Sequence, residues 1–192
     1  MRGQRRWREA GSGECGGPRA ARRALPFGFL LVFALLLFAL AFAVYMFDRP
    51  AGSAYLMPGW LAMHVPGRSV FGAAGQWLPS FAHAFAFTVL TAAVWPMARR
   101  RRAGFAAGLW CAIGSALEIG QHPALARPLS EALPAWFAAV PVLDHLGAYW
   151  LRGGFGADDL IAIVAGCATA GWLVAMASAD GIALEDRHVA HR

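Results

Sequence analysis

The sequence predicts an all-α integral membrane protein: a bundle of four transmembrane helices with two long loops on one side. Of 192 residues, 58% are hydrophobic and only 15% are charged, against about a quarter in ordinary soluble domains. Four apolar segments are long enough to cross a bilayer, which requires about 20 residues of helix. A soluble chain of this length could not cover so many apolar residues with polar surface, whereas lipid solvates them.

The first apolar segment, residues 24–47, carries no charge. As a helix it spans about 36 Å, enough to cross the ~30 Å hydrocarbon core with some tilt. A cleavable signal peptide has an apolar region of only about 7–15 residues, so we expect a retained first helix. The preceding residues 1–23 are rich in Gly and Arg without apolar periodicity, which predicts a disordered tail.

The second and third crossings are predicted at residues 77–98 and 103–121, separated by the run Arg99 to Arg102. The fourth is predicted at residues 158–179 and begins with two aspartates. Each of these segments has the length of a membrane-crossing helix and contains few ionisable residues.

The segments between and after these helices differ in composition. Residues 48–76 and 122–157 contain several prolines and glycines, which disfavour a crossing helix. Inside the second loop, residues 132–143 are apolar but too short to span, so we expect an interfacial or re-entrant segment. Residues 180–192 are polar and predict a second tail. The four predicted helices and the loops between them therefore form one membrane domain, residues 24–179.

Small residues recur at helical spacing in two of the predicted helices. Gly104 and Gly108 form a GxxxG spacing in the third helix, and Ala162, Gly166 and Ala170 repeat every fourth residue in the fourth. Such spacings allow helix backbones to approach closely. Both stripes are therefore small-residue packing faces, and in a structural subunit they would pack against a partner.

The distribution of arginine predicts the orientation. Net charge is +6, and all 17 basic residues are arginine. Thirteen lie in the two tails and the turn between the second and third helices, whereas four lie in the long loops. The positive-inside rule then places both termini in the cytoplasm and the long loops outside. Because topology accounts for the basic charge, we expect a lipid bilayer and no nucleic acid as partner.

Ionisable residues inside membrane spans are costly and mark candidate functional sites. The predicted topology brings His83, Glu118, Gln121, Asp158 and Asp159 to the outer end of the bundle. The pattern is consistent with a hydrogen bond from His83 to Glu118 or Asp159, and with His83, Glu118 and Asp159 as a catalytic cluster.

One further residue joins the candidate binding set. His122 follows Glu118 by four positions, so Glu118, Gln121 and His122 share one helix face. Gln121, His122 and Asp158 are therefore candidate binding groups.

Several chemistries use such groups. A His–carboxylate pair can act as a general acid and base, His and carboxylates can ligate a divalent metal, and the same groups can carry protons or ions. They can also simply hold helices together. No metal motif such as HExxH is present, so the sequence leaves metal and cofactor unassigned.

The order of these residues resembles a known family. A His in the second helix (His83), E-x-x-Q closing the third (Glu118 and Gln121), and D-x-x-x-x-x-x-G opening the fourth (Asp159 and Gly166) are similar to the VanZ-like family of small bacterial membrane proteins. The resemblance covers residues 77–179. This chain differs in having Pro79 and Ser80 where the family often has Asp-Lys, Ile163 where it often has Asn, and a longer second loop. In the family an Arg often precedes the aspartate. Arg152 lies near that position, so the resemblance implies Arg152 as a further candidate binding residue.

The resemblance implies a bacterial inner-membrane protein with a role at the cell envelope, since the family's named member is associated with resistance to the glycopeptide teicoplanin. It implies no reaction, because the family has no settled biochemical activity. We expect an accessory or binding role at the outer leaflet that affects envelope lipids or glycopeptide susceptibility. The alternatives are a membrane-embedded enzyme acting on a lipid head group and a structural subunit packed against a membrane protein partner.

Overall fold

The computed structural model describes residues 26–49, 63, 68–95, 99–141 and 143–189, and gives the backbone alone for 99–100 and 178–189. Within these ranges the chain is helical and contains no strand, so the predicted all-α fold is confirmed. The predicted tail 1–23 and most of the predicted loop 48–76 lie outside the described residues.

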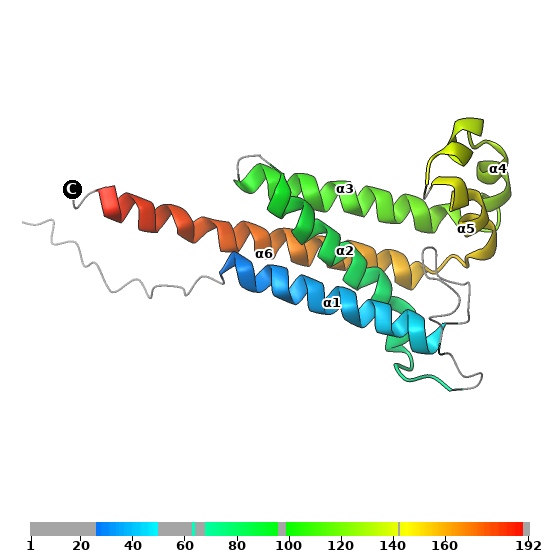
Figure 1. The fold of residues 1–192 in the computed structure, drawn as a ribbon, viewed down its shortest axis with the longest axis horizontal. Helices are drawn as coiled ribbons and strands as arrows, with labels where there is room; N and C mark the ends of the chain where they lie inside the picture. Colours follow the sequence, from blue (N-terminus) through cyan, green and yellow to red (C-terminus); the bar gives the residue numbers. More distant parts are fainter. Residues whose placement is uncertain (1–25, 50–62, 64–67, 96–98, 142, 190–192) are drawn as a thin grey trace, which may run out of the picture.

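Four long helices run along a common direction (Figure 1). They are α1 (Phe27–Asp48), α2 (Ala74–Val94), α3 (Arg99–Gly120) and α6 (Ala157–Val189). All four are long and apolar enough to cross a membrane, so the protein is a multi-pass membrane protein. We call the end where α1 and α3 finish and where α2 and α6 begin the polar end.

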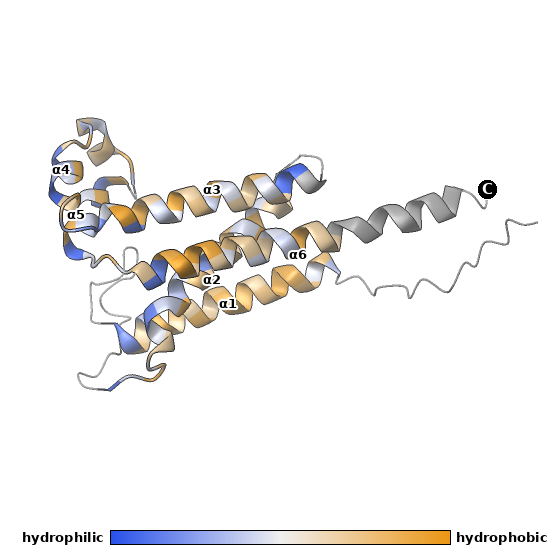
Figure 2. Ribbon diagram, turned by 180° about the vertical axis from the view of Figure 1, so that it is seen from behind, coloured by the Kyte–Doolittle hydropathy of each residue, from blue (hydrophilic) through white to orange (hydrophobic). Residues whose placement is uncertain are grey.

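Helix α2 lies at the centre of the bundle. In its apolar window 44% of the residues are buried, against 22% in α1 and in α3. Helix α2 packs most extensively on α6 and on α1, whereas α1 and α6 touch only slightly. Figure 2 shows that apolar residues cover α1 along its length, and many of its Phe and Leu side chains are exposed. The outer surfaces of the flanking helices are therefore suited to lipid.

Small side chains make up much of the core. Ala34, Ala86, Ala106 and Ala170 are fully buried and pack around Phe85 and neighbouring apolar residues. In lipid the hydrophobic effect does not drive helices together, so they associate through van der Waals contacts. The small alanine side chains allow the helix backbones to come close enough for many such contacts.

The predicted stripe on the fourth helix faces the core. Ala162, Gly166 and Ala170 are all buried. A β-carbon at Gly166 would lie 2.5 Å from the Phe81 carbonyl oxygen and 3.2 Å from Ala84 Cβ. The α2–α6 crossing therefore requires glycine at this position.

The predicted stripe on the third helix does not face a neighbour. Gly104 and Gly108 are exposed, and a β-carbon at either would meet no atom within 4 Å. Instead Ala103 and Ala106 are buried, and Ala107 approaches Gly171 of α6. The GxxxG face of α3 is therefore open within the described bundle, because α3 presents its alanines to the neighbouring helices instead.

The four arginines belong to a helix rather than to a turn. Helix α2 ends at Val94, and Trp95 adopts an extended conformation, as expected for a residue before a proline. Helix α3 then begins at Arg99, four residues before the predicted start. Arginine is a good helix former, so these residues extend the helix beyond its apolar part.

Helix α6 is also longer than predicted. It continues to Val189, through most of the polar segment expected to be a tail from residue 180. Polar residues end a membrane span but do not by themselves end a helix, and this segment contains no proline. The apolar part of α6 covers Ala157–Ala177, close to the predicted crossing.

The second loop forms a folded segment that we call the cap (residues 122–156). It contains α4 (Ala126–Glu131), the 3₁₀ turns η2 (Ala135–Ala139) and η3 (Leu143–His145), and α5 (Leu146–Arg152). Helix α4 packs on α5, and η2 packs on η3. Figure 1 shows the cap at the polar end, beside the last part of α3.

Candidate functional site

Glu118 is the centre of a hydrogen-bonded group at the polar end. It lies in the last turn of α3, is 6% exposed, and its Oε1 accepts the Gly156 backbone N–H at 2.7 Å. Gln121 Nε2 donates to Glu118 Oε2 at 3.3 Å and to the Tyr149 hydroxyl at 2.8 Å. A buried carboxylate requires such donors, because its charge is otherwise expensive.

Asp159 forms a second polar link, between α6 and α2. The Ser80 hydroxyl donates to Asp159 Oδ1 at 2.5 Å. Asp159 stands in the first turn of α6, where the helix dipole favours a negative charge. The turn before α6 therefore places Asp159 and the Glu118-bound Gly156 within three residues of each other.

Electrostatic interactions connect these groups to two further elements. Arg49 interacts electrostatically with Tyr45 and Asp159, and Tyr45 also interacts with Glu118. In the cap, burial, reinforced by the nearby Tyr45 and Glu118, raises the pKa of the Tyr149 hydroxyl. Tyr149 is therefore a neutral hydrogen-bonding group at physiological pH. We call Ser80, Glu118, Gln121, Tyr149 and Asp159 the polar cluster.

Two glycines allow the cap to close tightly on α3. A β-carbon at Gly120 would collide with the Trp150 indole, and one at Gly153 would collide with the Gln121 side chain. The Trp150 Nε1 is buried and has no hydrogen-bond partner in the described part of the chain. The cap and the end of α3 are therefore held by both close packing and the Gln121–Tyr149 hydrogen bond.

His83 lies apart from the carboxylates. Its Nδ1 is 2.6 Å from the Pro79 carbonyl oxygen, and since a carbonyl only accepts, Nδ1 carries the proton. Its ring packs against Phe38, Tyr45 and Phe87 at centroid distances of 5.1, 5.8 and 5.9 Å. Among the described residues neither Glu118 nor Asp159 bonds to His83. The expected His–carboxylate hydrogen bond is replaced by this local bond within α2.

Three of the four candidate binding residues are on the surface. His122 is exposed, packs edge-on against Phe155, and accepts the Ala124 N–H at 3.3 Å. Asp158 is exposed at the start of α6. Arg152 is exposed and donates to the Ala148 carbonyl within α5 at 3.2 Å. Only Gln121 joins the polar cluster.

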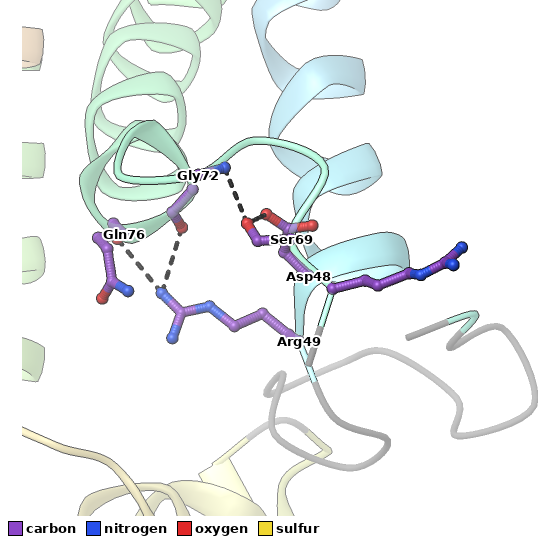
Figure 3. Close-up of a pocket in the computed structure, with 7 residues that line it drawn as sticks. Asp48, Arg49, Ser69, Gly72 and Gln76 are labelled. Carbon is purple, nitrogen blue, oxygen red and sulfur yellow. Dashed lines mark hydrogen bonds between the residues drawn. The ribbon is translucent and has the colours of Figure 1, made fainter. Parts of the chain in front are cut away.

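The junction between α1 and α2 contains two functional groups that sequence reasoning did not identify (Figure 3). Asp48 accepts hydrogen bonds from the Ser69 hydroxyl at 2.6 Å, the Val70 N–H at 2.6 Å and the Phe71 N–H at 2.9 Å. It thereby fixes the chain that enters α2. Its position at the end of an uncharged segment was the available signal.

Arg49 completes this junction. Pro79 has no N–H and therefore leaves the Gly75 carbonyl without its helical donor. The Arg49 Nη2 reaches this oxygen at 3.4 Å and the Gln76 carbonyl oxygen at 3.2 Å. Asp48, Arg49 and Gln76, together with Arg68, Ser69, Gly72 and Gly75, line an open cavity of about 260 Å³.

The side chains at the polar end decide whether it could hold a metal ion. No group of three or more His, Cys, Asp or Glu side chains that could hold a metal occurs in the described ranges. The cluster instead offers carboxylate, amide and hydroxyl groups, which donate and accept hydrogen bonds. These groups come from α2, α3, α6 and the cap.

Comparison with protein families, curated proteins and solved structures gives no match for this chain.

Proposed function

We propose that this chain is a VanZ-like bacterial inner-membrane protein with an accessory, binding role at the outer leaflet, where its polar cluster recognises an envelope lipid. The observation that carries the proposal is the joining of Glu118, Gln121 and Asp159 at one end of the bundle. These residues are also the motif positions behind the family resemblance. Ionisable groups at the ends of membrane spans are costly and therefore mark candidate binding sites. In this protein the same groups also join the helices to one another.

The arrangement of the helix ends supports the proposed orientation. The start of α1, the start of α3 and the end of α6 lie at the end of the bundle opposite the polar end (Figure 1). The thirteen arginines in the tails and the inter-helix run belong to these helix ends in the sequence. The positive-inside rule then favours cytoplasmic termini and an outward polar end.

The test is a lipid comparison in the host. The gene is deleted, and envelope lipids and lipid-linked cell-wall precursors are compared with those of the parent, together with glycopeptide susceptibility. Complementation uses the wild type and Glu118→Gln at matched expression, with Glu131→Gln as control, because Glu131 is an exposed acid outside the polar cluster.

We expect the deletion to change at least one lipid species or the susceptibility, and both the wild type and Glu131→Gln to restore it. Glu118→Gln should restore it incompletely, because the substitution turns one of the two acceptor oxygens into an NH2 donor, which would face either the Gly156 N–H or the Gln121 amide. An unchanged envelope after deletion, or full rescue by Glu118→Gln, would contradict the proposal.

One observation favours a second candidate, a structural subunit of a membrane complex. The small-residue face of α3 at Gly104 and Gly108 is unoccupied within the described bundle, and such faces commonly pack on other transmembrane helices. Native mass spectrometry in mild detergent tests this candidate. A higher assembly that Gly108→Leu abolishes would support it, and a monomer with full complementing activity would refute it.

The enzyme alternative has weaker support. It required His83 as a general acid or base paired with Glu118. In the described structure His83 bonds within its own helix and lies among aromatic rings, so no acid–base pair supports this reading.

A further inference from the structure

The cap has an unusual number of exposed apolar side chains for a segment outside the four spans. Trp136 is 59% exposed and Leu151 is 55% exposed. Four further apolar side chains of the cap are 36–39% exposed: Leu125, Leu129, Val140 and Phe155. In water such side chains would carry a hydration cost, which contact with an apolar environment removes.

The contacts of the cap explain why these side chains have no protein cover. Helix α4 contacts α5, and η2 contacts η3, but among the described elements neither α4 nor η2 packs extensively on the bundle. Only the α5 region closes on α3, through Trp150 over Gly120 and through Tyr149 bonded to Gln121. The part of the cap around Trp136 therefore projects from the bundle.

The direction of this projection identifies the occupant. Figures 1 and 2 show that the cap extends sideways from the end of α3, on the side away from α1. Part of the cap lies beside the last part of α3, and α4 lies past that end. The apolar span of α3 ends at Gly120, just before the cap, and the apolar span of α6 begins at Ala157, just after the cap. The cap is thus at the level where the hydrocarbon region meets the head groups.

We infer that the outward part of the cap, centred on Trp136 and Val140, inserts into the head-group interface of the same membrane. The occupant of its exposed apolar side chains is lipid, continuous with the lipid around α3. Tryptophan favours this depth because its ring is apolar and its N–H is polar. The exposed ion pair of Arg127 and Glu131 on α4, whose atoms are 3.6 Å apart, remains in water or among the head groups.

This inference does not depend on the proposed function. An interfacial cap would hold the polar end of the bundle at a fixed depth in the membrane, whichever ligand the polar cluster binds. It adds to the four spans a fifth membrane contact that lies along the surface.

The experiment measures depth by electron paramagnetic resonance. The full chain, with Cys15, Cys111 and Cys167 replaced by Ala, receives single cysteines by Trp136→Cys, Val140→Cys or, as control, Glu131→Cys. Each is spin-labelled and placed in lipid nanodiscs. Collision with oxygen, which partitions into lipid, is compared with collision with a neutral nickel chelate, which partitions into water.

We expect the oxygen-to-nickel accessibility ratio at 136 and 140 to exceed that at 131 severalfold. Equally low ratios at all three sites would overturn the inference, because the cap would then be in water. Labels at 136 and 140 shielded from both reagents would also overturn it, because a protein surface, such as a second copy of the chain, would then be the occupant. Thermal unfolding of each labelled protein checks that the fold is retained.

Discussion

At the scale of single residues, the polar end is stable because its carboxylates have donors. Glu118 receives a backbone N–H from Gly156 and the side-chain amide of Gln121, and Asp159 receives the Ser80 hydroxyl. Each of these bonds joins two different elements or fixes the end of one. Glu118, Gln121 and Asp159 therefore support the fold in addition to any ligand they bind.

The first prediction concerns the stability of this group. Glu118→Ala leaves the Gly156 N–H and the Gln121 amide without their acceptor, so we expect the free energy of unfolding to fall by about 1–3 kcal/mol. Glu118→Gln retains one acceptor and should cost less. Reversible unfolding in mixed micelles with increasing SDS measures both. Equal stability of the alanine variant and the wild type would show that these bonds contribute nothing.

A second prediction concerns the entry into α2. Asp48→Ala removes the acceptor of three hydrogen bonds, and we expect a loss of about 1–3 kcal/mol in the same unfolding assay. Glu131→Ala is the matched control. It removes only an exposed ion pair on α4, which should cost less than about 0.5 kcal/mol. A similar cost for both variants would contradict the anchoring role of Asp48.

The sequence predicted part of this site for a physical reason. Glu118, Gln121 and Asp159 stand at helix ends that alternate topology brings to the same side of the membrane. Tyr149 and Ser80 were not identified, because a hydroxyl gains its role from the partner that the fold supplies. His83 was placed on the correct helix, but its ring direction depends on the aromatic residues of α1.

At the scale of elements, hydropathy predicted each crossing, but spacing alone did not predict which helix face is buried. The stripes on α3 and α6 have the same period, yet only the α6 stripe is buried, and Gly166 is the one of their three glycines that meets a neighbour. The rotation of a helix depends on all its side chains and on the loops at its ends. Helix α3 begins with arginines, and helix α6 ends in polar residues. Both are longer than predicted because polar residues mark where a helix leaves the membrane, not where the helix ends.

A third prediction uses this contrast. Gly166→Leu forces side-chain atoms against the Phe81 carbonyl and Ala84 of α2, so we expect a loss of at least about 1–3 kcal/mol in unfolding free energy. Gly108→Leu is the matched substitution on an open face and should leave a monomer's stability nearly unchanged. Comparable losses for the two variants would indicate that the α2–α6 crossing is looser than described, or that α3 also packs on a partner.

At the scale of the whole molecule, the fold follows from composition and length. Four uncharged or nearly uncharged segments in one chain leave a helical membrane bundle as the stable solution, since backbone polar groups in lipid must be satisfied within each segment. The cap could not be predicted in the same way. Its short helices are fixed by contacts between α4 and α5 and by the closure of α5 on Gly120, which no local pattern in residues 122–156 specifies.

The outward orientation of the polar end, on which its proposed role depends, is tested by labelling with a membrane-impermeant maleimide in intact cells. In the cysteine-free chain, Arg127→Cys places a thiol on the exposed surface of the cap, and Arg101→Cys places one in the first turn of α3 at the opposite end. We expect the thiol from Arg127→Cys to be labelled in intact cells and the thiol from Arg101→Cys only after permeabilisation. The reverse pattern would refute the outward orientation, because the polar cluster would then face the cytoplasm.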